Sequence, residues 1–326
     1  MSVRAVVYAS GGVTYYDDFE AAKSADGTTW FRLTAPTDEE LDRVASVCGL
    51  HPLAVEDVQS DVRPKVEEFD GNTFVLVKDA RLASGETSFR GEVVTRPIGL
   101  FVGEDWLVTY APTELTAVER TWEFVRSEDS RVLQRGPDFA AYRVIDAVVD
   151  DYFRALDDVE DRLEFVEEEV LEETDAEVLE EINDARRELL ALRKIVWPTR
   201  DAVSTLARGD PPEVREATEK YYRDVYDHLI QQVDLVETYR DLAAGARDIY
   251  LNSLSMSTNE VMKKLTVVAT IVLPLTLVVG IFGMNFHDGP WNMPELAWRY
   301  GYPAVMVGMA LVAVVLLWYF RREDWL

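Results

Sequence analysis

Residues 265–285 read LTVVATIVLPLTLVVGIFGMN, and this stretch decides the fold. Its first nineteen residues, Leu265 to Gly283, carry no charge, which is about enough helix to cross a hydrocarbon core of ~30 Å. A second apolar run follows at 301–320. The sequence therefore predicts two transmembrane helices, 265–283 and 301–320, joined by a short loop over residues 286–300.

Basic residues beside these two runs predict their orientation. Lys263 and Lys264 precede the first run and Arg321 and Arg322 follow the second, whereas the loop between them carries a single arginine. Because basic residues collect on the cytoplasmic side of a membrane, we expect both termini, including the basic tail 321–326, in the cytoplasm. The first ten residues lack the apolar segment of a signal peptide. The expected location is the cell membrane, with two spans.

The composition is strongly acidic, with a formal net charge of −27 over 326 residues. Such a charge argues against a nucleic-acid partner bound through a basic patch. Only seven of the 33 basic residues are lysines, and this pattern favours a halophilic protein kept soluble in concentrated salt, where charge repulsion is screened. An ordinary acidic cytosolic domain is the alternative. The single cysteine, Cys48, excludes an intramolecular disulfide and a multi-cysteine zinc site.

Residues 1–137 have the pattern of a cytosolic α/β domain. Thr37, with Glu40 three residues later, forms a capping-box pattern that opens a helix, and a further helix is expected over 114–126. Residues 102–105 indicate a hairpin turn. Runs of β-branched and aromatic residues predict strands over 3–8, 13–16, 28–33, 73–78, 92–101 and 106–110. The chain has no glycine-rich phosphate loop and no GxSxG motif, so we do not expect an enzyme.

Strand patterns end near residue 138. Two long antiparallel helices, 141–173 and 175–206, are expected within a helical segment over 138–208, and Gly-Asp-Pro-Pro then breaks the pattern. From Glu213 to Gly283 no convincing stop signal occurs. A helix of that length measures about 105 Å at 1.5 Å per residue. Residues 212–285 therefore predict one long stalk helix that includes the first membrane span.

One face of this helix carries a stripe of small or weakly polar residues at alternating steps of three and four. The stripe ends at Gly283, and its other members are Asp248, Ser255, Asn259, Met262, Thr266, Ala269, Leu273, Thr276 and Gly280. Such a stripe of small residues is typical of a seam where two helices pack, and it could also line a pore. The residues within the membrane span alone leave both interpretations open. Its polar continuation into the cytosolic part favours a pore lining. Two helices per chain cannot enclose a pathway, so a pore requires the symmetry axis of an oligomer.

Three short motifs lie at the membrane runs: GMN at 283–285, MPEL at 293–296 and YGYP at 300–303. Together with the two-helix layout they resemble the CorA family of magnesium transport proteins. The resemblance covers about residues 50–326 and extends to segments NEVMK at 259–263, YRDVYDH at 222–228, RKIVWP at 193–198, VDDYF at 149–153 and RPKVE at 63–67. Phe282 stands where the family often has tyrosine, and residues 287–292 lengthen the loop.

The resemblance implies a fold and an activity. The fold is an α+β cytosolic domain followed by long helices and two transmembrane α-helices, assembled as a funnel-shaped homopentamer. The activity is conduction of hydrated Mg²⁺ across the cell membrane down its electrochemical gradient. Gly283, Met284 and Asn285 would form the selectivity filter, because Mg²⁺ releases its octahedral water reluctantly and is recognised by oxygen atoms. Asn259 would form a second ring.

The external loop is expected to attract cations through Asp288 and Glu295, with ordinary loop solubility as the alternative. Glu295 belongs to the MPEL motif with the remaining loop residues Met293, Pro294 and Leu296, whereas Asp288 lies in the lengthened part of the loop. The lengthened loop leaves the detailed chemistry of the pore entrance open.

A regulatory divalent-ion site between subunits is also implied by the resemblance. Asp224 and His228 share one face of the stalk helix because they are four residues apart, and Asp146 lies at the matching position on the preceding helix pair. We expect an acidic partner from the α/β domain and choose Asp79. The alternative for Asp224 is a plain ion pair with an arginine.

Other functions remain possible on sequence alone. Co²⁺, Ni²⁺ or Zn²⁺ could be the transported ion of a related protein, although the stripe lacks the cysteine or histidine cluster that favours zinc. Mg²⁺ is expected both as substrate and as regulatory ligand, with Co²⁺ as a further substrate. A membrane-anchored sensing or structural protein is the alternative from a different class.

Overall fold

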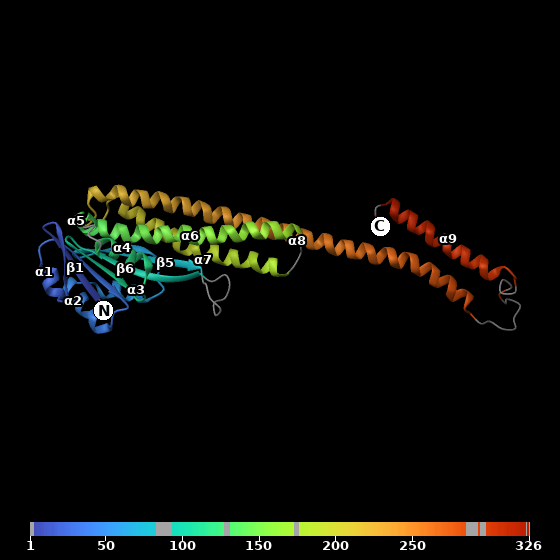
Figure 1. Ribbon diagram of the computed structural model, residues 1–326, viewed down its shortest axis with the longest axis horizontal. Helices are drawn as coiled ribbons and strands as arrows, with labels where there is room; N and C mark the ends of the chain where they lie inside the picture. The colour runs from blue at the N-terminus through green and yellow to red at the C-terminus, as the bar shows by residue number, and fades with distance from the viewer. Residues whose placement is uncertain are drawn as a thin grey trace. The chain divides into compact units, whose positions relative to one another are not determined.

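Seven strands in the N-terminal part of the chain form one mixed sheet (Figure 1). The order is β2-β1-β3-β7-β6-β5-β4, and neighbours are antiparallel except the parallel pair β3 and β7. The strands are β1 Val3–Ala9, β2 Gly12–Tyr16, β3 Thr28–Thr34, β4 Lys65–Phe69, β5 Asn72–Leu82, β6 Val93–Val102 and β7 Trp106–Ala111. The computed structural model describes residues 3–82, 93–126, 131–172, 176–284, 293, 298–323 and 325.

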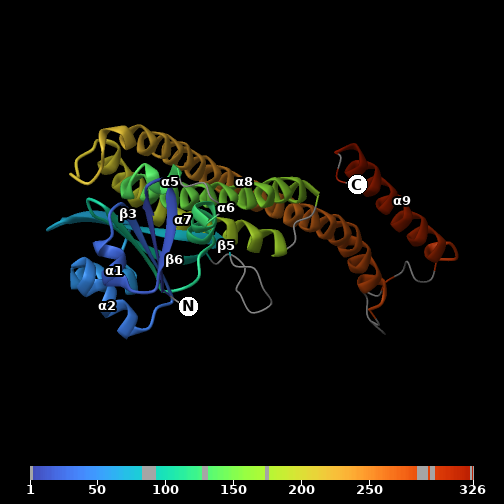
Figure 2. The same ribbon diagram turned by 60° about the vertical axis from the view of Figure 1, so that its left-hand side comes forward.

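Each face of the sheet is covered by helices, because its strands alternate between two cores. On β5, Val75 and Val77 belong to one core, while Phe74 and Leu76 belong to the other. The second core is closed by α1 Phe19–Ser24, α2 Asp38–Cys48 and α3 Pro52–Gln59. The first is closed by α4 Thr116–Arg126, α5 Arg131–Gln134 and the long helices (Figure 2). The expected α+β class is confirmed.

The capping pattern at Thr37 is present as predicted. The Thr37 hydroxyl accepts a hydrogen bond from the Glu40 backbone N–H at 3.3 Å, and the Glu40 carboxylate accepts one from the Thr37 N–H at 2.9 Å. The turn over 102–105 joins β6 to β7 as an antiparallel pair. Three short helices, α1, α3 and α5, and the edge strand β4 were not anticipated.

Three long helices follow the sheet. They are α6 Pro137–Glu172, α7 Ala176–Ala207 and α8 Glu216–Phe282. In Figures 1 and 2, α6, α7 and the first part of α8 lie side by side. Direct hydrogen bonds join α8 to α6, since Gln232 on α8 donates to the Val149 carbonyl on α6 at 2.7 Å and the Tyr222 hydroxyl on α8 donates to the Asp138 carbonyl on α6 at 2.9 Å.

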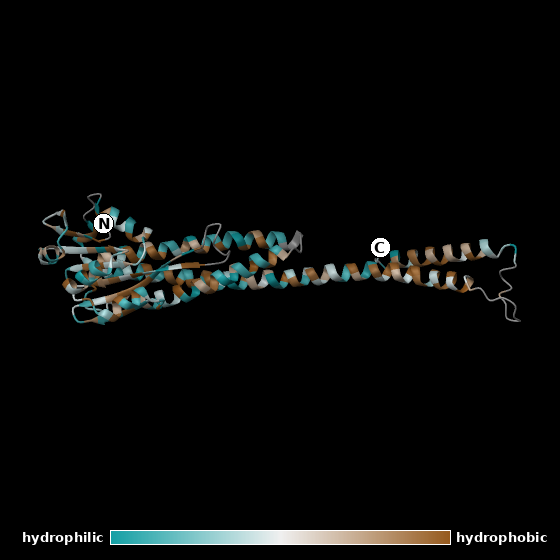
Figure 3. Cartoon of the chain, turned by 90° about the horizontal axis from the view of Figure 1, so that it is seen from below, coloured by the Kyte–Doolittle hydropathy of each residue, from teal (hydrophilic) through white to brown (hydrophobic). Residues whose placement is uncertain are grey.

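The chain divides into two compact units, Met1–Asp248 and Ile249–Leu326. The second unit contains the rest of α8 and α9 Gly301–Arg322. Both α8 and α9 contain windows long and apolar enough to cross a membrane, and the apolar colouring is concentrated in the helices of this unit (Figure 3). The two expected spans therefore correspond to helices in the structure.

Candidate metal centre and ion pathway

Three metal-ligating side chains converge between α6 and α8. Asp146 and Asp150 lie one turn apart on α6 and His228 lies on α8, and one ligand atom of each lies within 4.8 Å of the others. The spacing of four places both carboxylates on one face of α6, while Ile145 and Val149 are buried in the core behind them. Two carboxylates and an imidazole form a donor set suited to a divalent cation.

The electrostatics of this group favour a bound cation. Burial raises the pKa of Asp146, the negative charge of Asp150 raises it further, and Asp224 adds to the same effect. Arg143, which lies 2.9 Å from the Asp146 carboxylate, and His228 act in the opposite direction. A divalent ion would remove the repulsion between the carboxylates and favour their ionised form.

His228 has a ring nitrogen that is available to bind a metal ion. Its Nδ1 atom is buried and has no hydrogen-bond partner within the part of the chain that the structure describes. The ring packs edge-on against Phe153, with centroids 6.0 Å apart. Because a buried polar atom without a partner is costly, the geometry around His228 fits a bound ion or an ion-bound water.

The structure brings Asp224 near this group but not into its centre. Asp224 is exposed and lies one turn before His228 on α8, and its charge contributes to the raised pKa of both Asp146 and Tyr142. It is not one of the three residues whose ligand atoms converge. Asp150 takes that place, and its spacing of four from Asp146 was the signal in the sequence that could have identified it.

Asp79, in contrast, is enclosed among arginines in the sheet. Its side chain is 0 % exposed, and its carboxylate lies 2.8 Å from Arg96 and 3.3 Å from Arg81. Asp79 on β5 and Arg96 on β6 are cross-strand partners in the register, and both arginines contact the same carboxylate oxygen, Oδ2. The other carboxylate oxygen, Oδ1, is buried without a hydrogen-bond partner in the described part of the chain, but Asp79 is not among the residues whose ligand atoms converge. We therefore do not carry it into the proposed metal site.

The stripe on α8 is turned outward from its own chain. Asp248, Ser255, Asn259, Met262, Thr266, Leu273, Thr276 and Gly280 are exposed, and Ala269 is half-buried. The opposite side of the span contacts α9: Leu275 and Val278 line an apolar groove with Val305 and Met309 of that helix, and Val267 is buried. The stripe is therefore not the seam that joins the two helices of one chain.

Small and polar members of the stripe are open to the surroundings of the chain. A Cβ atom added to Gly280 would meet no atom within 4 Å. The hydroxyls of Thr266 and Thr276 donate to the carbonyls of Met262 and Val272 at 2.7 and 2.9 Å, and each hydroxyl oxygen keeps acceptor capacity for water. These positions are therefore open to a neighbouring subunit, to lipid or to water.

Helix α8 ends one residue before the expected filter. Phe282 is its last residue, the Gly283 N–H donates to the Val279 carbonyl at 2.9 Å, and Met284 is exposed. Asn285, Asp288, Pro294, Glu295 and Leu296 lie outside the described residues. Their assigned functions therefore stay predictions, as does that of Met293.

Comparison with known proteins agrees with this architecture. Residues 25–322 match the model of the family described as CorA-like Mg²⁺ transporter protein. The chain is 39 % identical over 304 residues to the cobalt/magnesium transport protein CorA of Thermotoga maritima, covering 91 % of this chain and 83 % of that protein. A CorA of Methanocaldococcus jannaschii is 28 % identical over 303 residues.

A solved structure shares the fold over the whole chain. The complete structure of the CorA magnesium transporter from Methanocaldococcus jannaschii superimposes with a TM-score of 0.85 at 25 % identity, covering 100 % of this chain and 99 % of that one. The match includes both membrane helices as well as the sheet. The chain belongs to the CorA-like Mg²⁺ transporter family.

Proposed function

We propose that the protein conducts hydrated Mg²⁺ across the plasma membrane down its electrochemical gradient, with Co²⁺ as a second substrate. The observation that supports this most directly is the outward stripe on α8, which faces away from α9 and runs to the Gly-Met-Asn triplet. Two membrane helices cannot enclose a path, so we propose a homopentamer with the five α8 stripes around the axis. Membership of the CorA-like Mg²⁺ transporter family indicates that the transported ion is Mg²⁺.

The stripe provides the surfaces that a hydrated ion needs. Asn259 and Asn285 would contribute rings of amide oxygen, which can bind the water shell of Mg²⁺ without removing it. Met262 and Leu273, which are 56 % and 67 % exposed in the chain, would form apolar constrictions that close by dewetting. Asp248 would add negative charge at the cytosolic end.

Flux measurements test this proposal. Protein reconstituted in liposomes should take up Mg²⁺, and Asn285→Ala should remove most of the uptake while gel filtration still shows an intact oligomer. Asn292→Ala, which changes an asparagine of the same loop outside the triplet, is the matched control and should retain uptake. If the parent protein carried no Mg²⁺, the alternative of a membrane-anchored sensing protein would replace the proposal.

We also propose that Asp146, Asp150 and His228, with Asp224 beside them, bind a regulatory divalent ion that favours the closed state. The support is the 4.8 Å cluster and the unpartnered Nδ1 of His228. An ion shifts the equilibrium only if it binds one state more tightly than the other. At low cytosolic Mg²⁺ the ion would leave, and repulsion among the carboxylates would favour the open state.

Inhibition by internal Mg²⁺ tests this second proposal. The double variant Asp146→Asn/Asp224→Asn should keep a high flux when Mg²⁺ is raised on the cytosolic side, because the site can no longer hold the ion. Asp227→Asn is the matched control, since Asp227 is an exposed acid on the same helix outside the cluster. Equal inhibition of the double variant and the parent would remove these residues from the regulatory site.

Competition experiments distinguish the transported ions. If Mg²⁺ is the main substrate, an excess of Mg²⁺ should suppress Co²⁺ or Ni²⁺ uptake, whereas Zn²⁺ should compete weakly because the stripe offers oxygen and thioether atoms and no imidazole or thiolate. Dominant Zn²⁺ uptake would instead assign the protein to zinc transport.

A further inference from the structure

A pocket with a volume of about 290 Å³ lies at the end of β5, the start of α4 and the middle of α6. Arg81 of β5 lines it together with Asp151, Arg154 and Asp158 of α6, and Thr116, the first residue of α4, adds a hydroxyl. None of these residues belongs to the Asp146 cluster or to the membrane stripe. Nothing in the proposed transport mechanism uses this pocket.

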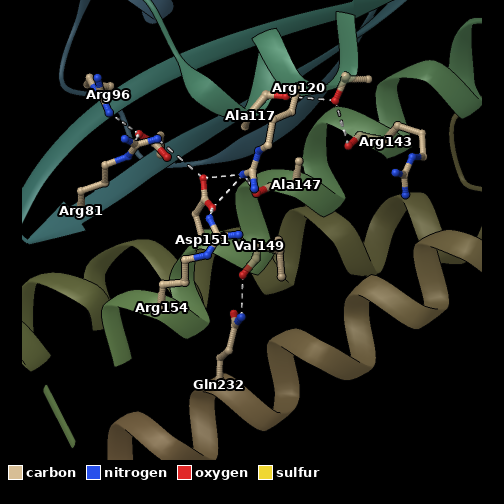
Figure 4. A network of polar contacts seen from close by, with 12 residues as sticks. Arg81, Arg96, Ala117, Arg120, Arg143, Ala147, Val149, Asp151, Arg154 and Gln232 are labelled. Atoms are coloured by element: carbon tan, nitrogen blue, oxygen red, sulfur yellow. Dashed lines mark hydrogen bonds and ion pairs between the residues drawn. The ribbon is translucent and has the colours of Figure 1, made fainter. Parts of the chain in front are cut away.

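Both arginines of the pocket reach the same carboxylate. Asp151, whose side chain is 4 % exposed, accepts hydrogen bonds from Arg120 at 2.8 Å and from Arg154, and Arg81 lies 3.8 Å away (Figure 4). The arginines are open to solvent, since the side chains of Arg81 and Arg154 are 43 % and 64 % exposed. Asp151 thus holds the guanidinium groups at the pocket without covering them.

Guanidinium donors exceed carboxylate acceptors in this network. Four arginines share the two buried acids Asp151 and Asp79, and each guanidinium carries five N–H donors. The Nε atoms of Arg96 and Arg120, and one acceptor, the Oδ1 atom of Asp79, are buried without a hydrogen-bond partner in the described part of the chain. This is a local surplus of positive charge and of donors in a protein with a net charge of −27.

We propose that this pocket binds a small phosphate anion, with Arg81 and Arg154 as its main ligands. A guanidinium fork matches the oxygen spacing of phosphate and can donate two parallel hydrogen bonds. The volume lies at the lower limit for pockets that hold drug-sized ligands, so we choose the small anions inorganic phosphate and pyrophosphate as its ligands. Asp158, an exposed carboxylate of the lining, repels anions and weakens binding, whereas the additional oxygen atoms of pyrophosphate can accept more hydrogen bonds from the two guanidinium groups.

Calorimetric titration of the full-length protein in detergent tests the proposal independently of transport. The buffer contains a chelator and no divalent ion, so that neither anion can bind through a metal at the Asp146 cluster. Parent protein should bind inorganic phosphate and, more tightly, pyrophosphate. The double variant Arg81→Gln/Arg154→Gln should bind both at least about tenfold more weakly, because two charge-assisted contacts are lost. Arg120 still pairs with Asp151 in this variant, so the fold is retained.

Arg187→Gln is the matched control. Arg187 also pairs with a buried aspartate three residues before it, Asp184, and its side chain is 61 % exposed, which reproduces the setting of Arg154 away from the pocket. The Arg187→Gln variant should bind both anions as tightly as the parent does, and the Asp158→Asn variant should bind them more tightly. The proposal is overturned if the parent binds neither anion at millimolar concentration, if the double variant binds as tightly as the parent, or if Arg187→Gln weakens binding equally.

Discussion

At the scale of single residues, the fold controls the chemistry of the one cysteine. Burial raises the pKa of the Cys48 thiol to about 12, with an opposing effect from Lys23 and a smaller raising effect from Asp105. The side chain is 8 % exposed in the core between the sheet and α2. Since the thiolate is the reactive form, Cys48 should be inert in the folded protein.

Alkylation followed by mass spectrometry checks this prediction. At pH 8 iodoacetamide should modify folded Cys48 at least about a thousandfold more slowly than the denatured chain, as expected for a pKa three units higher together with burial. Because the fold favours the protonated thiol, Cys48 contributes to the free energy of unfolding. This contribution is complete below the unfolded pKa of 9.0 and is lost as the pH rises toward about 12. Equal labelling rates would contradict the prediction.

A substitution at Gly280 tests whether the α8 stripe lines a pore or faces lipid. A side chain at this position meets no atom of its own chain, so Gly280→Val should leave the subunit fold intact. If the stripe faces the axis of the oligomer, the added methyl groups narrow the path and Mg²⁺ flux should fall at least about tenfold. A decrease of that size corresponds to about 1.4 kcal/mol in the barrier to permeation.

Gly308→Val is the matched control for Gly280. Gly308 lies in the interior of α9, and an added Cβ likewise meets no atom within 4 Å. Both substitutions carry the same helix-propensity effect, and Gly308 lines the groove between α8 and α9, so the control replaces a glycine on the α8–α9 side instead of one in the stripe. Comparable flux in the two variants would place the α8 stripe away from the ion path.

At the scale of elements, buried tyrosines attach α6 to its neighbours. The Tyr152 hydroxyl on α6 donates to the Lys78 carbonyl on β5 at 2.5 Å, and the side chain is 0 % exposed. Tyr152→Phe should lower the free energy of unfolding by about 1 kcal/mol, because one buried hydrogen bond is lost while the packing stays. The melting temperature should fall by about 2–4 °C.

Tyr222 provides a second, independent test of the same idea. Its hydroxyl joins α8 to the Asp138 carbonyl near the start of α6, so Tyr222→Phe should have an effect of similar size. Because the two bonds share no partner, the double variant should show the sum of the two losses. A melting temperature unchanged in both variants would mean that these hydrogen bonds contribute little to helix attachment.

Local patterns in the sequence predicted most of the helices and strands but not which strands pair with one another. Runs of β-branched and aromatic residues identified six strands, and the capping box identified the start of α2 within a residue. The charged run Lys65–Phe69 concealed β4, which pairs along one edge only, with β5. The parallel pairing of β3 with β7 joins segments about 75 residues apart, and no local pattern records such a contact.

The same limit applies to the candidate sites. Helical spacing placed Asp224 and His228 on one face of a helix and grouped the residues of the membrane stripe on another, because a helix fixes which residues share a face. Asp79 was chosen without knowledge of the β5–β6 register, which places it opposite Arg96. Asp150 was not assigned, although it lies four residues from Asp146. Contacts between elements, here α6 with α8, had to be known before the cluster could be recognised.

At the scale of the whole molecule, the net charge of −27 should make stability depend on salt. Most of the 60 acidic residues belong to the part of the chain before the membrane helices, and assembly of several subunits would bring more negative charge together. Salt shortens the distance over which these charges repel, from about 10 Å at 0.1 M to about 3 Å at 1 M. The oligomer should therefore be more stable in concentrated KCl.

Thermal melting and gel filtration of the full-length protein in detergent check this prediction. Raising KCl from about 0.1 M to about 2 M should raise the melting temperature and preserve the oligomer, because self-repulsion destabilises a compact, highly charged state. Sucrose at matched osmotic strength is the control, since it stabilises by exclusion from the surface without screening charge. A larger effect of KCl than of sucrose supports salt adaptation. If KCl lowers the melting temperature or acts no more strongly than sucrose, the acidic composition reflects an ordinary cytosolic surface.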